Sequence, residues 1–439
     1  MNEDYQTLKH QAEGLRKQER FDEAIVLYEK LWNMSADNLD KWVGWGYAYC
    51  LRKAGRSTDA LEICRDVYKL DAQFDRNNNL YGWCVYDTGI KQLEDDFDEK
   101  RFLEAAQAIT QLTAQGDFSP YERTVLAVVH HYEKYKEGTK PVPHAEIIAW
   151  LDKLNPELLS AEPGRGADGK SYPSLKEDWY TSRAKALLGL ERYEECIAVC
   201  TQALNEFKQL HYDYDVWFRN SRAESLLALG KGAEALPDIE YMMARKPDPW
   251  IRHRYALALR AIGRLDEAIC YAAEAALPHQ RLGYRWEVYL DLGEMLAEMG
   301  EDELAASHIL LAAAIRKEEG WDKVPQRLQA ALRRMNLSLE NLPRVKDAHR
   351  RLQSFWKSQK PRPKTSHTGT IKLIHGNGKS GVIRADSGTE HFFAMRSYKG
   401  DAEPKQGLRV AFNVKEEINQ KTERPELHAV DIVSETDSR

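Results

Sequence analysis

The chain has 439 residues, of which 43% are hydrophobic and 30% are charged, and its formal net charge at pH 7 is -6. That length is enough for two or three domains with buried cores. The negative balance argues against a chain coated throughout for nucleic acid. No apolar run approaches the roughly 18 residues that a membrane span requires. A membrane partner is therefore not expected, and the cytoplasm is the expected location.

One layout recurs along most of the chain: a helix led by aromatic residues, a turn, and a second helix. The first copy is AEGLRKQERFDEAIVLYEKL, from residue 12. The next is WVGWGYAYCLRKAGRSTDALEIC, whose first helix ends at Gly55 and whose second carries Ala60. Glycine permits a left-handed turn between two helices, and a small alanine lets the second helix approach the first. The layout predicts a helical hairpin.

The middle of the chain fits this layout less well. Residues 120–176 read as an irregular region that ends in the glycine-rich stretch SAEPGRGADGKSYPS. Gly164, Gly166 and Gly169 have the spacing of a dinucleotide-binding loop, but such a loop follows a buried strand and opens a helix. This stretch follows a helical pattern and lies between two prolines, so we expect a loop rich in turns. After it, YTSRAKALLGLERYEECIAVC resumes the repeat, with Cys196 in the place of the small alanine.

Three clearer copies follow, each with a glycine and an alanine five residues later: Gly230 and Ala235, Gly263 and Ala268, Gly300 and Ala305. The alanines lie 33 and 37 residues apart, on either side of the roughly 34-residue period of tetratricopeptide repeats. The chain resembles that family. The resemblance implies a superhelix whose first helices line a concave surface, which is a binding scaffold for a protein or peptide and not a catalyst.

Arginine side chains are frequent on these first helices. Some must face the concave surface at helical spacing, where an acidic or phosphorylated partner would suit them. The alternative is ordinary solvation of exposed helix faces. The candidate partner-binding residues are Arg183, Arg219, Arg222, Arg252, Arg254 and Arg260.

The composition changes after the last repeat. Between residues 344 and 364 there are eight Lys and Arg against one Asp, which gives 8 - 1 = +7. The sequence predicts a capping helix here, followed by the stiff linker KPRPKTS. Its Lys360, Arg362 and Lys364 are candidate contacts to phosphates, since such cations displace counterions without reading sequence. The expected domains are residues 1–342, a basic helix and linker at 343–366, a barrel at 367–434 and a tail at 435–439.

The C-terminal region predicts five short strands. HGNGKSG, residues 375–381, looks like the end of a phosphate-binding loop, but Leu373 stands where that loop needs a glycine, and strands follow instead of a helix. The strands and turns suit a small barrel that resembles a cold-shock domain, an oligonucleotide-binding (OB) fold. The matching residues are Gly369, Thr370, Lys372, Lys379, Gly381, Ile383 and Phe392.

Cold-shock barrels bind single strands by stacking bases on exposed aromatic rings. Most of those rings are replaced here: Leu373, Ile374, Ser380, Val382, Ala394 and Met395 stand in their places. Phe393 is expected to point into the core. The candidate nucleic-acid-binding residues of the barrel are Lys372, His375, Lys379, Arg384, His391 and Phe392.

Two functions are compatible with these patterns. In the first, the chain is a non-enzymatic adaptor that holds single-stranded RNA or DNA with its barrel and linker and recruits a protein with its helices. In the second, the barrel has lost nucleic-acid binding and the chain is a protein scaffold or regulatory subunit, for example in a bacterial defence or stress complex. No cofactor or metal is expected. The six cysteines, including Cys196 and Cys200, suit packing as reduced thiols.

Overall fold

The computed structural model describes residues 2–34, 40–91, 97–135, 140–166, 169–278, 282–321, 323–359, 367–400, 402–418 and 425–434. The fold is mainly α-helical, with tetratricopeptide-like hairpins and a closed five-stranded β-barrel, as the sequence predicts. The chain divides into two compact units, residues 1–238 and 239–439. The domain boundaries expected near residues 342 and 366 stay predictions.

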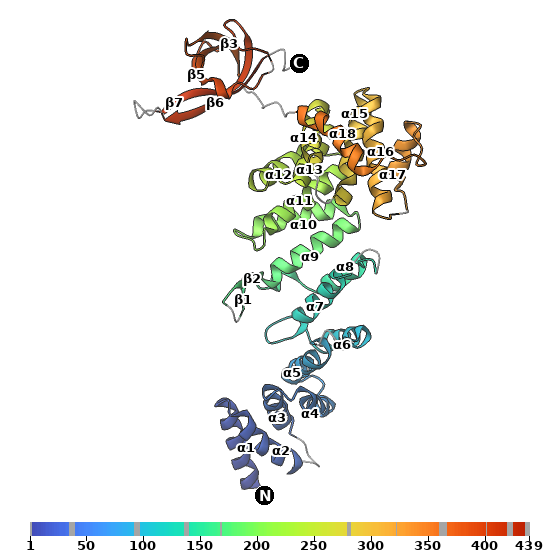
Figure 1. Ribbon diagram of the computed structural model, residues 1–439. Coiled ribbons are helices and arrows are strands. Elements are labelled where there is room, and N and C mark those ends of the chain that lie inside the picture. The colour runs from blue at the N-terminus through green and yellow to red at the C-terminus, as the bar shows by residue number, and fades with distance from the viewer. Residues whose placement is uncertain are drawn as a thin grey trace. The chain divides into compact units, whose positions relative to one another are not determined.

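Helical hairpins build the first unit, and Figure 1 shows them following one another in chain order. The helix α5 (Asp75–Val85) continues into a π-helical turn, Tyr86–Ile90. The helices are α1 (Asn2–Lys17), α2 (Phe21–Met34), α3 (Lys41–Lys53), α4 (Ser57–Leu70), α5 (Asp75–Val85), α6 (Glu99–Leu112), α7 (Tyr121–Glu133), α8 (His144–Leu151), α9 (Leu175–Gly189), α10 (Tyr193–Glu206) and α11 (Tyr214–Ala228).

The turn within each clear hairpin has the predicted geometry. Gly55, Gly230, Gly263 and Gly300 have φ between 72° and 81°, in the left-handed region that favours glycine. The alanine five residues later is completely buried in every case: Ala60, Ala235, Ala268 and Ala305. In two weaker hairpins a glutamate adopts the same left-handed conformation, with φ of 59° at Glu19 and 58° at Glu191. The layout therefore sets the turn even where glycine is missing.

The irregular region contains two helices, α7 and α8, and a small exposed hairpin. The hairpin pairs β1 (Gly164–Arg165) with β2 (Ser171–Tyr172) in antiparallel fashion. The next helix, α9, begins with a capping box: Ser174 accepts from the backbone N–H of Glu177, and Glu177 accepts from that of Ser174. The glycine-rich stretch thus belongs to an exposed hairpin, because β1 is not the buried strand that a dinucleotide loop follows.

The second unit begins within α12 (Gly232–Arg245) and contains further helices before the barrel. Its helix α18 (Val345–Ser358) packs against α14 (Leu265–Ala276) and α16 (Asp302–Glu318), as a capping helix would. The helices are α13 (Pro249–Ala261), α14 (Leu265–Ala276), α15 (Trp286–Glu298), α16 (Asp302–Glu318), α17 (Gln326–Arg334) and α18 (Val345–Ser358).

Trp356 anchors α18. The indole is completely buried, and its Nε1–H donates to Nε2 of His308 on α16 at 2.8 Å. His308 is equally buried, and its Nδ1 lies 2.7 Å from the carbonyl oxygen of Leu304. One nitrogen of the ring therefore donates and the other accepts, which requires the neutral imidazole. The rings of Tyr289 and His349 complete the cluster at 5.6 and 4.8 Å from that of Trp356.

The barrel closes in the order β3-β4-β5-β7-β6, with β6 paired back to β3. All pairs are antiparallel except β5 with β7, which is parallel. The interior contains Ile371, Ile383, Phe393, Val410, Phe412 and Ile432, all completely buried, so the prediction for Phe393 is confirmed. The strands are β3 (His367–Ile374), β4 (Ser380–Ala385), β5 (Glu390–Ala394), β6 (Arg409–Ile418) and β7 (Pro425–Ser434).

Candidate nucleic-acid and partner interfaces

One row of side chains crosses the outside of the barrel, and we call it the barrel row. Residues that face each other on paired strands point to the same side of a sheet. The pairing sets Leu373 opposite Val382, Val382 opposite Phe392, and Phe392 opposite His428. Phe392 is 39% exposed. The barrel row therefore consists of Leu373, Val382, Phe392 and His428.

Two imidazole rings flank Phe392. The ring of His428 lies 5.1 Å from that of Phe392, and the ring of His375 lies 6.1 Å away at an interplanar angle of 31°. Nδ1 of His375 is 2.9 Å from the hydroxyl of Ser380, which holds this ring near the row. Phe392 therefore belongs to a group of three rings. His428 was not among the residues predicted from the sequence. The alternation of LHAVDIV, which predicts a strand with His428 on its outer face, was the available signal.

The expected cations of the barrel differ in their surroundings. Lys372 forms an ion pair with Glu390 at 2.7 Å, and this hydrogen bond keeps the pKa of Glu390 below its usual value despite some desolvation. Arg384 is exposed and faces Glu390 across β4 and β5. Lys379 is exposed and forms no ion pair among the described residues. Lys415, which the sequence reasoning did not single out, is exposed and faces His428 across β6 and β7.

One expected contact points elsewhere, and three others are outside the described residues. His391 is 7% exposed, with its Nε2 3.0 Å from the hydroxyl of Thr389 and its ring 5.7 Å from that of Phe412. It points into the barrel and away from the barrel row. Lys360, Arg362 and Lys364 lie outside the described residues. The structure therefore brings together His375, Phe392 and their neighbours, without His391.

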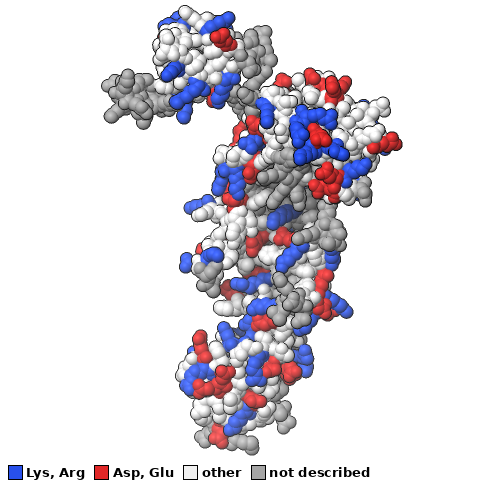
Figure 2. Space-filling model, in the orientation of Figure 1, with Lys and Arg blue, Asp and Glu red and all other residues white. Residues whose placement is uncertain are grey.

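The arginines expected to face a partner make contacts within the chain. Arg183 pairs with Asp152 at 2.6 Å, and Arg252 pairs with Glu274 at 3.0 Å. Arg219 and Arg222 both bind Asp238, which is 2% exposed, at 2.8 and 2.7 Å. Arg254 is partly exposed and has interactions of its own. In Figure 2, basic and acidic side chains lie interspersed over the visible face.

Arg260 belongs to a larger ion cluster. It pairs with Glu294 at 3.2 Å, and Arg327 contacts both Glu294 and Asp291. Asp291 is 1% exposed, and Nε2 of His253 lies 2.7 Å from its carboxylate. Burial alone would raise the pKa of Asp291, but the hydrogen bond and charge of His253 and the charge of Arg327 lower it. These cations are therefore paired with carboxylates of the same chain, and their role in partner binding stays a prediction.

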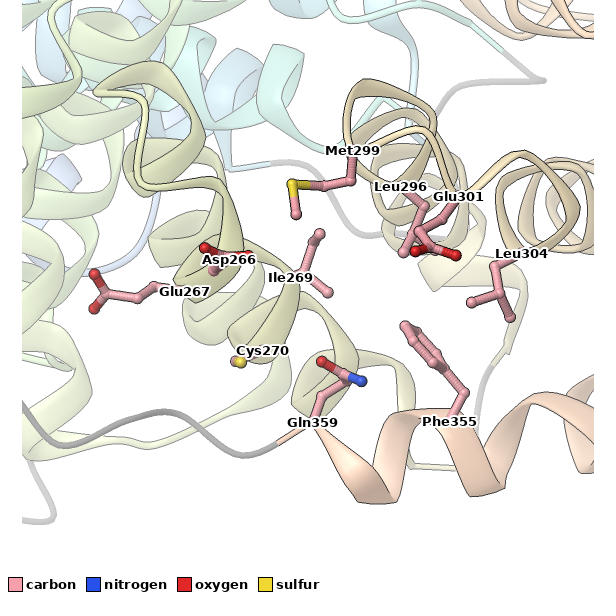
Figure 3. Close-up of a pocket in the computed structure, with 10 residues that line it drawn as sticks. All are labelled: Asp266, Glu267, Ile269, Cys270, Leu296, Met299, Glu301, Leu304, Phe355 and Gln359. Atoms are coloured by element: carbon pink, nitrogen blue, oxygen red, sulfur yellow. The ribbon is translucent and has the colours of Figure 1, made fainter. Parts of the chain in front are cut away.

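An apolar groove lies between α14, α15, the start of α16 and α18. Its volume is about 310 Å³. Figure 3 shows the side chains of Ile269, Met299 and Phe355 pointing into the same space. Asp266 and Glu301 lie at its edge, and neither forms an ion pair among the described residues. We call this space the α14–α18 groove.

Cys270 lies in the α14–α18 groove and is partly exposed, whereas the other five cysteines are buried. The sulfur atoms of Cys196 and Cys200 lie 4.0 Å apart. No three His, Cys, Asp or Glu side chains of the described ranges gather as metal ligands. Within the same ranges, no helix has the length and apolar character needed to cross a bilayer.

No protein-family model matches the chain, and no curated protein matches it. A tetratricopeptide repeat protein from Parabacteroides merdae is 10% identical with a TM-score of 0.30, over 76% of this chain and 99% of that chain. The TPR2AB domain of yeast Sti1, in a pHSP90 complex, is 13% identical with a TM-score of 0.26, over 76% and 100%. A tetratricopeptide repeat protein of Thermus thermophilus is 16% identical with a TM-score of 0.21, over 58% and 98%. We take nothing about function from these matches.

Proposed function

We propose that this chain is a non-enzymatic adaptor that binds single-stranded RNA or DNA through its barrel and a protein partner through its helices. The observation that carries the first part is the exposed ring of Phe392 between those of His375 and His428. Bases of any identity stack on such rings. Lys379 and Arg384 lie on the neighbouring strand β4 or just before it, where they reach phosphates.

The strand pairing supports the cold-shock-like, OB-type interpretation of the barrel. OB folds are five-stranded Greek-key barrels that bind oligonucleotides on the face of their second and third strands. The barrel row crosses β4 and β5, which are the second and third strands of this barrel. Few stacking rings remain, so we expect weak binding. Each base stacked on an aromatic ring contributes about 1–3 kcal/mol.

The test is fluorescence anisotropy of labelled oligouridine and oligothymidine with the full chain at low and physiological salt. Phe392→Ala and His428→Ala should each weaken binding by about fivefold or more, because each removes a stacking ring. Leu427→Ala is the matched control. Leu427 is 55% exposed and adjoins His428, but alternation along the strand turns it away from the barrel row. Equal effects of the three substitutions would contradict the barrel as the binding site.

The α14–α18 groove favours a second candidate function, that of a protein scaffold. Its apolar walls suit an apolar side chain, and Asp266 and Glu301 at its edge suit a neighbouring Lys or Arg. The occupant that we propose is therefore a peptide segment that combines apolar and basic residues. A synthetic peptide of leucine and lysine should slow alkylation of Cys270 in the groove, and one of leucine and glutamate should not. If both peptides slowed the alkylation of Cys270 equally, the proposal that Asp266 and Glu301 select a basic peptide would be wrong.

A further inference from the structure

Three aromatic side chains form one face of α3. Trp42, Trp45 and Tyr49 are spaced i, i+3 and i+7, which places them on one side of a helix. Trp42 is 45% exposed, and Trp45 and Tyr49 are partly exposed. The ring centroids of Trp42 and Trp45 lie 6.3 Å apart, and those of Trp45 and Tyr49 lie 5.6 Å apart. The helix therefore presents a short series of neighbouring rings to solvent.

Cations from three helices lie over these rings. Arg16 of α1 lies 5.0 Å from the ring of Trp45 and 5.8 Å from that of Tyr49. Arg76, in the first turn of α5, lies 5.5 Å from Trp42 and 5.9 Å from Trp45. Lys53, at the end of α3, lies 5.7 Å from Tyr49. We call Arg16, Trp42, Trp45, Tyr49, Lys53 and Arg76 the aromatic–cationic face.

The three cations of this face have no carboxylate partner within the described part of the chain. Neighbouring basic residues are neutralised: Lys9 pairs with Asp40 and Lys41 with Asp71, both at 2.6 Å. Arg16, Lys53 and Arg76 form no such ion pair among the described residues. Nε of Arg16 is buried without a hydrogen-bond partner in the same set. The face therefore has uncompensated positive charge beside its rings, in a chain whose net charge is negative.

The chemistry of the face identifies its ligand. An acidic peptide would neutralise the cations but leave the two tryptophans unused, and a proline-rich peptide would pack on the rings but leave the cations unused. A nucleic-acid strand uses both, because each nucleotide carries an aromatic base and a phosphate. In a duplex the faces of the bases are already stacked, so the strand must be single.

We propose that the aromatic–cationic face binds single-stranded nucleic acid, with bases on Trp42, Trp45 and Tyr49 and phosphates at Arg16, Lys53 and Arg76. This face lies in the first compact unit and the barrel in the second. It is therefore a second site that does not rest on the barrel. A chain with two sites of modest affinity gains overall affinity for a strand that reaches both.

The experiment uses the full chain with Phe392→Ala and His428→Ala, so that failure of the barrel and failure of this face are distinguishable. Oligouridine and oligothymidine are titrated while tryptophan fluorescence is followed, since a stacked base quenches the indole. Both should bind at low salt, and the better of the two shows whether RNA or DNA is preferred. Trp42→Ala should weaken binding about tenfold, and Trp42→Phe should retain most of it. Arg76→Ala should reduce the slope of the logarithm of the binding constant against the logarithm of salt concentration by about 1, which corresponds to the loss of one phosphate contact.

Two matched controls test whether the effects are local. Trp217 of α11 is 51% exposed and has no place in this face, so Trp217→Ala should leave binding unchanged. Arg20 is exposed and paired with Glu23, so Arg20→Ala should leave the salt dependence unchanged. No binding of either oligonucleotide, or equal loss in Trp42→Ala and Trp217→Ala, overturns the proposal. Binding of a proline-rich peptide in the absence of oligonucleotide binding would assign the face to a protein instead.

Discussion

The burial of His308 should make the docking of α18 depend on pH. Burial lowers the pKa of His308 to about 4, although the hydrogen bond to the Leu304 carbonyl opposes the shift. Nε2 already accepts the indole N–H of Trp356, so a second proton would replace an attraction with a repulsion. In the unfolded chain the pKa is near its ordinary value of about 6.5. The unfolded chain therefore binds the proton first as pH falls.

The sign and the magnitude follow from this difference. Because the folded pKa is the lower one, the stabilisation is complete above pH 6.5 and is lost as pH falls toward 4. One unit of pKa corresponds to about 1.36 kcal/mol, so the second unit should lose about 2 kcal/mol at this site between pH 7.5 and pH 5. Opening of α18 exposes His308, so the free energy of opening of this helix, measured by its protection from hydrogen exchange, should decrease by a similar amount.

His308→Gln isolates the contribution of His308. Glutamine offers an oxygen to Trp356 but does not titrate. Hydrogen exchange over residues 345–358, corrected for the intrinsic effect of pH, gives the free energy of opening for both proteins. The other ionisable groups of the region, including His349, are common to both and cancel in the difference. The difference in free energy of opening between the unsubstituted protein and His308→Gln should shrink by about 2 kcal/mol from pH 7.5 to pH 5. A difference that stays constant over this range would refute the reasoning.

Three further predictions concern stability and reactivity. Glu191→Gly should raise the free energy of unfolding by about 1 kcal/mol in thermal melts, because glycine removes the cost of the left-handed turn; a decrease would contradict it. Asp238→Ala should destabilise the chain by about 3 kcal/mol in urea titrations, because it leaves the largely buried guanidinium of Arg222 without its carboxylate partner. Asp59→Ala, which removes one partner of an exposed pair, should change stability by less than about 0.5 kcal/mol. Cys270 should be the first thiol alkylated in the native chain, and mass spectrometry showing a buried cysteine ahead of it would argue against the described packing.

The repeat layout could be predicted because it rests on local chemistry. A glycine in a left-handed turn and an alanine five residues later are properties of one hairpin, and both are visible in the sequence. The barrel could be predicted for the same reason, since alternation along each strand separates Phe392 from Phe393. Glu19 and Glu191 occupy the same turn without the glycine signal, so the weaker hairpins were recognised with less support.

The surroundings of the charged residues could not be predicted. Arg183 and Arg260 look available along their helices, but their carboxylate partners, at the end of α8 and on α15, lie about 30 residues away in the sequence. His428 meets Phe392 only through the parallel pairing of β5 with β7, which are not consecutive strands. The aromatic residues of α3 were visible as the start of a repeat. Their use as a surface depends on Arg16 and Arg76, which come from two other helices.

The closure of the barrel has a consequence for how such a module is carried by a larger chain. An open sheet exposes a row of backbone N–H and C=O groups at each edge, and this row is a template for pairing with another copy. Here β3 pairs with both β4 and β6, so the barrel is closed, and the stretch of β6 at 413–418 is the part that pairs with β7 alone. The closed part of the barrel therefore needs no covering helix against edge-to-edge aggregation. Copies of the module held close together should therefore pair along the 413–418 stretch or remain separate proteins.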